Sequence, residues 1–347
     1  METPQQELLD RFLADHSDVP GVLLHMSGPG FDWSGASGVR EASTEDPLAP
    51  DTTYRIASIT KTFVAAAVLR LAELGKLELD DAMGLHLEDG PVREALGDRR
   101  CKEIRLRHLL THTSGLPDFV EDTDYAARTL ADLQRRWTPL EQVELALTID
   151  DIAEVGAEFH YSDTGYVVLG AIVEHLTGTE LAPALRTLLR FDALGLQSTY
   201  MEGLEPAPAT AGERAHQYTD GVDTFDADPS FDLWGGGGLV STTTDVARFF
   251  RALFDGRVYD NPQTIELMTT PAMSAEGAHI ALGIAGRDFS GHRLWGHGGY
   301  WGVYAGFVPD VGVALSVAVL ERNALGAVAT ELLPGSLELA LTLASDG

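Results

Sequence analysis

A serine and a lysine stand three residues apart at the start of the most apolar helical pattern in the chain. The motif is Ser58-Ile59-Thr60-Lys61, and the pattern covers 58–74. Residues at i and i+3 share one face of a helix, so the Ser58 hydroxyl and the Lys61 amine are predicted to be neighbours. Burial and the positive end of the helix dipole are expected to lower the pKa of Lys61. A neutral lysine beside a serine is a general base beside a nucleophile.

Lysine is scarce in this sequence. Lys61, Lys76 and Lys102 stand against twenty-one arginines. Arginine cannot lose its proton near neutral pH. A lysine retained in such a chain is therefore a candidate for a group that must be deprotonated to function. The alternative for the motif is a helix-capping serine followed by a solvated lysine. The helix is apolar nearly all round and is therefore expected to be buried, which disfavours a solvated Lys61.

Two other short segments carry residues suited to the same chemistry. Tyr161 lies in the segment 159–163, ahead of a helical pattern, and a phenolate flanked by cations is a competent base. The alternative interpretation is that segment 159–163 is a loop leading into a helix cap, without a catalytic role. His297 lies on a glycine-rich predicted strand, 295–300. Glycines in a strand often mark the close approach of another backbone or a ligand. The alternative is a glycine-rich strand end that carries a surface histidine.

Strand patterns gather at the two ends of the sequence, and helical patterns fill the middle. A glycine run at 235–238 precedes a helix whose N-cap is predicted at Thr243 or Thr244. The C-terminal helical sequence is expected to break at 334–335, a Pro-Gly pair. The other predicted helices are 4–16, 58–74, 141–147 and 164–176, and the predicted strands are 21–26, 31–38, 294–296, 304–308 and 313–320.

This distribution predicts an α/β fold. An antiparallel sheet flanked by helices is built from both termini, and an all-helical region is inserted into it. The α/β domain would comprise residues 1–75 and 235–347, and the mainly helical region residues 76–234. A site is then expected in the cleft between the two parts.

The three motifs, in this order, resemble those of the serine β-lactamase and penicillin-binding protein superfamily. The similarity is greatest to its class C β-lactamase-like branch, which includes D-alanyl-D-alanine carboxypeptidases, D-aminopeptidases and carboxylesterases. The resemblance extends over about residues 15–325 and implies the β-lactamase/DD-peptidase-like fold. The segments that carry it are 54–61, 109–117, 161–166 and 237–242.

The resemblance also implies a role for each site residue. Ser58 would attack an ester or amide carbonyl, and Lys61 and Tyr161 would pass its proton to the leaving group. The backbone N–H groups of Ser58 and Tyr300 would form an oxyanion hole, whose donors are typically worth about 3–4 kcal/mol each. Water would then hydrolyse the acyl-Ser58 ester. The positions implied to bind substrate are Asp163, His297, Gly298 and Gly299.

Two of these positions depart from the family pattern. Asp163 stands where an asparagine commonly holds the acyl amide of the substrate, and His297 stands where a lysine is common. Both changes make the site less positive, since histidine is a poor fixed cation near pH 7. We therefore expect esters, amides or peptides with a free amine rather than substrates with a carboxylate. The alternative is that Asp163 caps the following helix, or pairs with Lys61 and never touches substrate.

Other features narrow the partners. The net charge of −29 argues against nucleic acids and anionic membranes, and no segment is apolar enough to be expected to span a membrane. The single cysteine, Cys101, excludes an intrachain disulfide. The first residues lack the basic and apolar regions of a signal peptide, which predicts a cytoplasmic protein, or a secreted one if a leader has been removed. We expect a small-molecule or short peptide substrate, and the oligomeric state is left open.

No cofactor or metal is expected. The glycine run 235–238 does not match the dinucleotide-binding fingerprint. His108 and His112 lie four residues apart but lack the glutamate of H-E-x-x-H, so His112 is interpreted as a packed loop residue.

The same acyl-enzyme permits other functions. An amine or alcohol could displace water, which would make the protein an acyltransferase or transpeptidase. The protein could also be a β-lactamase, or a penicillin-binding sensor that is acylated without turnover. The sequence does not separate hydrolysis from acyl transfer, because the first half-reaction is identical.

Overall fold

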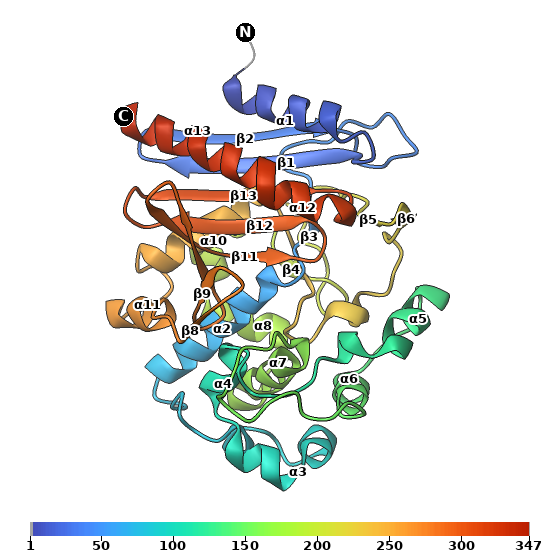
Figure 1. Cartoon of the computed structure of the whole chain (residues 1–347), viewed down its shortest axis with the longest axis vertical. Coiled ribbons are helices and arrows are strands. Elements are labelled where there is room, and N and C mark those ends of the chain that lie inside the picture. Colours follow the sequence, from blue (N-terminus) through green and yellow to red (C-terminus); the bar gives the residue numbers. More distant parts are fainter. Residues whose placement is uncertain (1–2, 347) are drawn as a thin grey trace.

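An eight-stranded antiparallel sheet runs through the computed structural model, which describes residues 3–346 (Figure 1). Its strand order, β2-β1-β13-β12-β11-β10-β9-β8, places the N-terminal hairpin beside the C-terminal strands. The predicted antiparallel sheet built from both ends of the chain is thereby confirmed. Its strands are β1 (Gly21–Gly28), β2 (Phe31–Gly38), β8 (Met273–Ala275), β9 (Ala278–Ile280), β10 (Ala285–Phe289), β11 (His292–Gly299), β12 (Val303–Val308) and β13 (Val313–Val319).

Each face of the sheet buries its own core, because successive side chains of a strand point to opposite faces. Val22 and Leu24 of β1 belong to a cluster with α1 (Pro4–Asp15) and α13 (Leu333–Asp346). Leu23, between them, belongs to the larger cluster on the other face, where α10 (Thr243–Phe254) packs on β12 and β13. The sheet is therefore the middle layer of the molecule.

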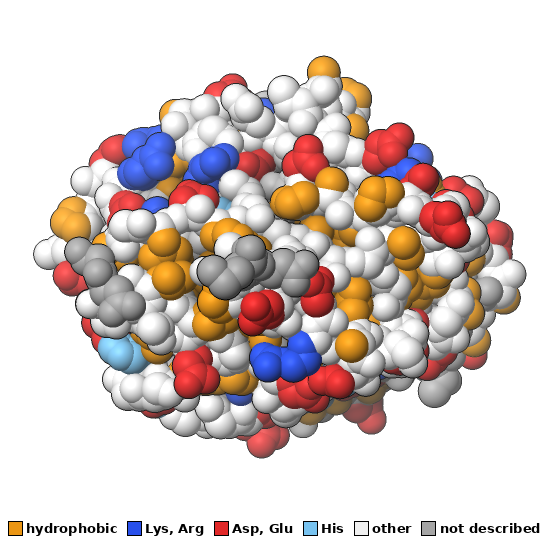
Figure 2. Space-filling view, turned by 90° about the horizontal axis from the view of Figure 1, so that it is seen from above, with side chains coloured by type: hydrophobic (Ala, Val, Ile, Leu, Met, Phe, Trp, Pro, Cys, Tyr) orange, Lys and Arg blue, Asp and Glu red, His pale blue; other side chains and the backbone are white. Residues whose placement is uncertain are grey.

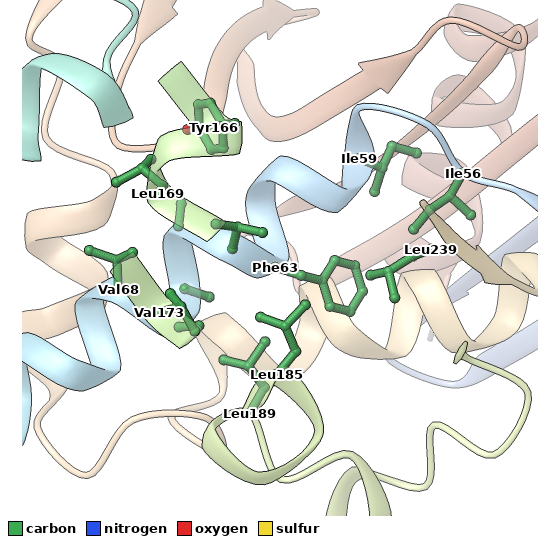
Figure 3. Close-up of a cluster of buried hydrophobic side chains, with 14 of the residues drawn as sticks. Ile56, Ile59, Phe63, Val68, Tyr166, Leu169, Val173, Leu185, Leu189 and Leu239 are labelled. Carbon is green, nitrogen blue, oxygen red and sulfur yellow. The ribbon is translucent and has the colours of Figure 1, made fainter. Parts of the chain in front are cut away.

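Helix α2 (Ile59–Glu73) passes through the larger core. Every residue from Ile59 to Leu71 is buried. The Phe63 ring stacks on the Phe249 ring with their centroids 3.6 Å apart, and Leu185 and Leu239 belong to the same cluster (Figure 3). A helix enclosed on all sides has little freedom to move, so its first turn is held rigidly.

Helices fill the chain between the two parts of the sheet and lie at the end of the molecule away from β1 and β2 (Figure 1). The boundaries between the α/β domain and the helical region, at 75/76 and 234/235, stay a prediction. These helices are α3 (Pro91–Glu103), α4 (Leu106–Leu110), α5 (Thr123–Ala131), α6 (Pro139–Ala146), α7 (Asp163–Thr177), α8 (Leu181–Leu188) and α9 (Phe191–Leu194). Short strands occur within the helical region and in the segments next to it in sequence. They are β3 (Tyr54–Arg55), β4 (Tyr200–Met201), β5 (Tyr218–Thr219), β6 (Val222–Asp223) and β7 (Leu239–Ser241). The remaining helices are α11 (Pro262–Met268) and α12 (Leu325–Ala327).

Two predicted details are wrong. Helix α10 is capped by Thr242, whose side chain accepts the Asp245 N–H, and not by either of the next two threonines. The C-terminal helix does not break at Pro334, since a π-helical turn at Val328–Leu332 leads directly into α13. Pro334 is the second residue of α13 and follows that π-helical turn directly.

The helical stretch Arg322–Ser345 is long and apolar enough to cross a membrane, judged by length and composition alone. In the structure its apolar residues Leu332, Leu337 and Ala340 are buried in the cluster that covers the sheet. Figure 2 views the molecule from above, from the end where α1 and β2 lie in Figure 1, and shows acidic side chains spread among apolar ones. The helix thus packs on the sheet through these residues, and 39% of its apolar window is buried.

Phe63→Ala is expected to lower the free energy of unfolding by about 3–5 kcal/mol, because it leaves a cavity that the enclosed helix cannot collapse into. Denaturant unfolding followed by tryptophan fluorescence measures the change. Leu74→Ala is the control, since Leu74 ends the same helix and is 49% exposed. It should change the free energy by less than about 0.5 kcal/mol. Similar losses in both variants would contradict the central position of α2.

Candidate active site

Ser58 lies where a short strand meets the buried helix. Strand β3 pairs with β7, and the chain then turns through Ala57, whose φ is 46°. A non-glycine residue in this left-handed region costs about 1–3 kcal/mol and persists only where the surrounding structure enforces it. Ser58 precedes α2 without making a side-chain capping bond. Its hydroxyl is therefore available to Lys61.

Three acceptors surround the Lys61 amine. Lys61 Nζ donates to Ser58 Oγ at 2.9 Å and to the Gly236 carbonyl oxygen at 2.6 Å. It also forms an ion pair with the Asp163 carboxylate at the start of α7. An ammonium group has three N–H donors, so these contacts satisfy the charged form completely. Since Lys61 is fully buried, its charge is compensated by these neighbours rather than by solvent.

The expectation that Lys61 has a lowered pKa is wrong. Burial does act to lower the pKa of Lys61, but the Asp163 carboxylate, with Tyr161 and Asp232 behind it, outweighs burial and raises the pKa above its usual range. The helix dipole and burial alone would favour neutral Lys61, but the Asp163 carboxylate comes from another helix, and its pairing with Lys61 was one of the alternatives for Asp163. The resting site therefore holds an ammonium group, which favours negative charge on Ser58 Oγ. Lys61 must lose a proton before it can act as a base.

Tyr161 lies beside this pair. Lys61 Nζ is 5.0 Å from the centre of the Tyr161 ring. Burial raises the pKa of Tyr161 to about 12, although the Lys61 charge and hydrogen bonding favour the phenolate. Ser58, Lys61 and Tyr161 are thus brought together, as the sequence predicts. A proton acceptor becomes available among them only as the pH rises.

His112 holds Tyr161 in place. The two rings stack with their centroids 4.3 Å apart, and His112 Nδ1 accepts the Ser162 N–H at 3.1 Å. Burial, and next the Lys61 charge, hold the pKa of His112 well below its usual value, so the imidazole is neutral. The interpretation of His112 as a packed loop residue is confirmed by its burial. Its packing on Tyr161 was not predicted, although His112 lies in the segment 109–117, which resembles the family.

A second carboxyl group holds the start of α7. The helix is capped by Ser162, whose Oγ accepts the Gly165 N–H, and not by Asp163. The Asp163 N–H donates to Asp118 Oδ2 at 3.0 Å. Burial, and next the Asp163 charge, raise the pKa of Asp118 to about 7. Of the two alternatives to substrate binding by Asp163, pairing with Lys61 is therefore the one present in the structure. Substrate contact by Asp163 stays a prediction.

The glycines of β11 bring a second backbone against the start of α2. A Cβ atom at Gly299 would lie 2.6 Å from the Ile56 carbonyl oxygen and 3.1 Å from Ala57 Cβ, so a larger residue would push the strand away. Within residues 3–346, neither the Ser58 N–H nor the Tyr300 N–H donates to another protein group. Two unused donors on adjoining segments are what an oxyanion hole requires.

His297 does not supply the cation that is common at this position in the family. Its ring centroid is 6.4 Å from that of Tyr161. Burial, and next the Lys61 charge, lower the pKa of His297 to about 4, so the ring is neutral at pH 7. Its Nδ1 lies 2.6 Å from the Gly298 carbonyl oxygen, which can only accept, so Nδ1 carries the proton. Within the described residues, no group of three or more His, Cys, Asp or Glu side chains is arranged to hold a metal ion.

His112→Asn is expected to lower kcat about three- to tenfold while KM stays near the wild-type value. Asparagine tolerates the left-handed backbone at this position, where φ is 55°, but it has no ring to stack on Tyr161. Such a stack is worth about 0.5–1.5 kcal/mol. The pH at which kcat rises should also shift, which a purely structural effect would not produce. His175→Asn, at the other end of α7, is the control. An unchanged kcat and pH profile in folded His112→Asn would rule out the positioning role.

Comparisons with known proteins agree with this geometry. The beta-lactamase family profile matches residues 9–329. Penicillin-binding protein 4 of Amycolatopsis lactamdurans is 30% identical over 352 residues, which span 94% of this chain and 85% of that protein. The structure of a D-stereospecific amidohydrolase from Streptomyces sp. has a TM-score of 0.79 at 28% identity, covering 92% of this chain and 94% of that one. The D-amino acid amidase of Ochrobactrum anthropi SV3, complexed with L-phenylalanine, has a TM-score of 0.81 at 26% identity. The match covers 97% of this chain and 98% of that one. The matches extend over nearly the whole chain, which therefore belongs to the beta-lactamase family.

Proposed function

We propose that this protein is a serine hydrolase that forms an acyl-enzyme on Ser58 from an ester, amide or short peptide. The observation that carries the proposal is the contact of 2.9 Å between Ser58 Oγ and Lys61 Nζ, next to two unused backbone donors. A nucleophile, a proton-transfer group and an oxyanion hole are the parts that acyl transfer needs. The family and its hydrolase members among the similar structures support the same reaction class.

The proposed reaction has two halves. Ser58 Oγ attacks the carbonyl carbon, and the N–H groups of Ser58 and Tyr300 bind the resulting oxyanion. The proton of Ser58 passes through Lys61 or Tyr161 to the leaving amine or alcohol as the carbon–leaving group bond breaks. Water then attacks the acyl-Ser58 ester, loses a proton by the same route, and releases the acid and the free serine. Since Lys61 and Tyr161 both hold protons at neutral pH, the rate should increase toward alkaline pH.

The charges around the site favour neutral or amine-bearing substrates. His297 is neutral, and the Lys61 charge is already paired with Asp163. The carboxyl groups of Asp118 and Asp232 add further negative charge when ionised. A substrate carboxylate would meet no unpaired cation among these groups, which argues against β-lactam hydrolysis as the main activity. The names of the two similar structures, an amidohydrolase and an amidase, support amides as substrates.

A fluorophosphonate is expected to add one covalent group, on Ser58, and Ser58→Ala should abolish both labelling and turnover. Peptide mapping by mass spectrometry identifies the labelled residue. Lys61→Arg keeps the charge but cannot release its proton, so it should lower turnover about a hundred- to ten-thousandfold. Lys76→Arg, at an exposed lysine, is the matched control. Label on Ser114, Ser162 or Ser241 instead would show that the nucleophile is misassigned.

Asp163→Asn is expected to move the pH dependence of kcat/KM toward lower pH. The Asp163 carboxylate raises the pKa of Lys61, so removing its charge lets Lys61 lose its proton at lower pH. An adjacent opposite charge typically shifts a pKa by about 1–3 units, which is the size of movement expected. Assays of a neutral p-nitrophenyl ester across the pH range measure it. Asp288→Asn, at a surface carboxylate paired with Arg293, is the control. An unmoved profile would exclude Lys61 as the titrating group.

A further inference from the structure

One carboxylate near the ion pair has no partner. Asp232 ends a short 3₁₀ turn, Pro229–Asp232, just ahead of the glycine run. No side chain or backbone N–H in the described part of the chain donates to its oxygens, and only charges at longer range act on it. Asp232 is neither fully buried nor fully exposed, so the residue keeps some contact with solvent. A desolvated carboxylate without a donor is unfavourable, so Asp232 either takes up a proton or binds a cation.

Two consecutive glycines connect Asp232 to the reacting residues. A Cβ atom at Gly237 would lie 2.3 Å from Asp232 Oδ1, and one at Gly236 would lie 3.5 Å from Asp163 Oδ1. The Gly236 carbonyl oxygen also accepts the hydrogen bond from Lys61 Nζ. The two carboxyl groups therefore flank a backbone segment that itself touches Lys61. Side chains at the two glycines would occupy the space next to both carboxyl groups.

The turn that carries Asp232 is fixed by hydrogen bonds from α5, from α6 and from the loop between them. The Trp137 N–H donates to Ser230 Oγ at 2.7 Å, and Gln142 Nε2 donates to the Ser230 carbonyl oxygen at 3.1 Å. The Tyr125 hydroxyl donates to the Phe231 carbonyl oxygen. A carboxylate held in this way loses little conformational freedom when a ligand binds, which favours binding.

A second anchor links the turn to the nucleophile. Arg55, three residues before Ser58, donates from Nη2 to the Ala227 carbonyl oxygen at 2.7 Å and from Nη1 to the Thr224 carbonyl oxygen at 2.8 Å. Its Nε donates to Glu202 Oε2 at 2.7 Å, so the Arg55 charge is paired with Glu202 and is not free for Asp232. The same side chain thus holds both the strand that leads to Ser58 and the loop that leads to Asp232.

The other two carboxyl groups are already engaged. Asp163 forms the ion pair with Lys61. Asp118 accepts the Asp163 and Val120 N–H groups, and it is only 2% exposed. Of these three acids, Asp232 is the one with no hydrogen bond or ion pair to its oxygens among the described residues.

We propose that Asp232 binds the ammonium group of the substrate and makes the enzyme selective for acyl donors with a free amine close to the scissile carbonyl. This inference rests on the proposed acyl-enzyme function and names its substrate class. A charge-assisted hydrogen bond between ammonium and carboxylate gives a preference of about ten- to a hundredfold. Burial, and next Asp163, raise the pKa of Asp232 to about 7, and a bound ammonium group favours its ionised form.

The test compares two substrates that differ only in the amine. Phenylalanine p-nitroanilide, as both enantiomers, is paired with 3-phenylpropanoyl p-nitroanilide, which lacks the amine. Asp232→Asn keeps the size of the side chain and removes its charge. It should lower kcat/KM for the preferred phenylalanine anilide about ten- to a hundredfold and change the value for the desamino anilide less than about threefold. Asp226→Asn, at an exposed acid on the same loop, should leave the ratio unchanged.

Each other outcome has a definite meaning. Equal losses on both substrates would show that Asp232 only supports the fold of the site, and an unchanged ratio would show that it does not meet the amine. Either result overturns the inference but leaves the proposed function in place if Ser58 is still labelled by a fluorophosphonate. A wild-type enzyme that hydrolyses neither anilide and is not labelled at Ser58 would overturn the proposed function itself, and the inference with it.

Discussion

The buried ion pair between Lys61 and Asp163 determines most of what surrounds it. A fully buried ammonium group is stable only when it is paired and hydrogen-bonded, and removing one partner of such a pair typically costs about 3–5 kcal/mol. The two residues come from different helices, α2 and α7, so the pair holds those helices in one relative position. The Ser162 cap and the Asp118 carboxyl group fix the first turn of α7. These contacts therefore support the nucleophile even though none of them touches it.

Burial, and next the charge of Lys61, keeps the two neighbouring histidine rings neutral. The Lys61 charge contributes to the lowered pKa of His112 and of His297, and it favours the phenolate of Tyr161. A neutral His112 can accept the Ser162 N–H through Nδ1, which a protonated imidazole could not do. The same neutral ring stacks on Tyr161, so burial of His112 supports both the hydrogen bond and the stack.

The fold was predictable because its signals are local. The strand patterns at 21–26 and 31–38 indicated the hairpin, and the continuous apolar surface of the helix at 58–74 indicated burial. The i,i+3 spacing of Ser58 and Lys61 was sufficient to place them together. The protonation of Lys61 was not predictable in the same way, since its partner lies a hundred residues away on another helix. For the same reason the sequence did not single out Asp232, whose environment comes from segments far apart in the chain.

The two departures from the family pattern act as one electrostatic change. With an asparagine at position 163, Lys61 would lose its carboxylate partner, and burial would act on its pKa without that opposing charge. With a lysine at position 297, a second buried ammonium group would stand near the first, and the carboxylate of Asp163 would already be taken. A neutral His297 avoids that repulsion, and Asp163 compensates the one cation that remains. The site is left with one carboxyl group, that of Asp232, that has no partner. No unpaired cation lies among the residues described around it. Such a balance is complementary to a cationic substrate rather than to an anionic one.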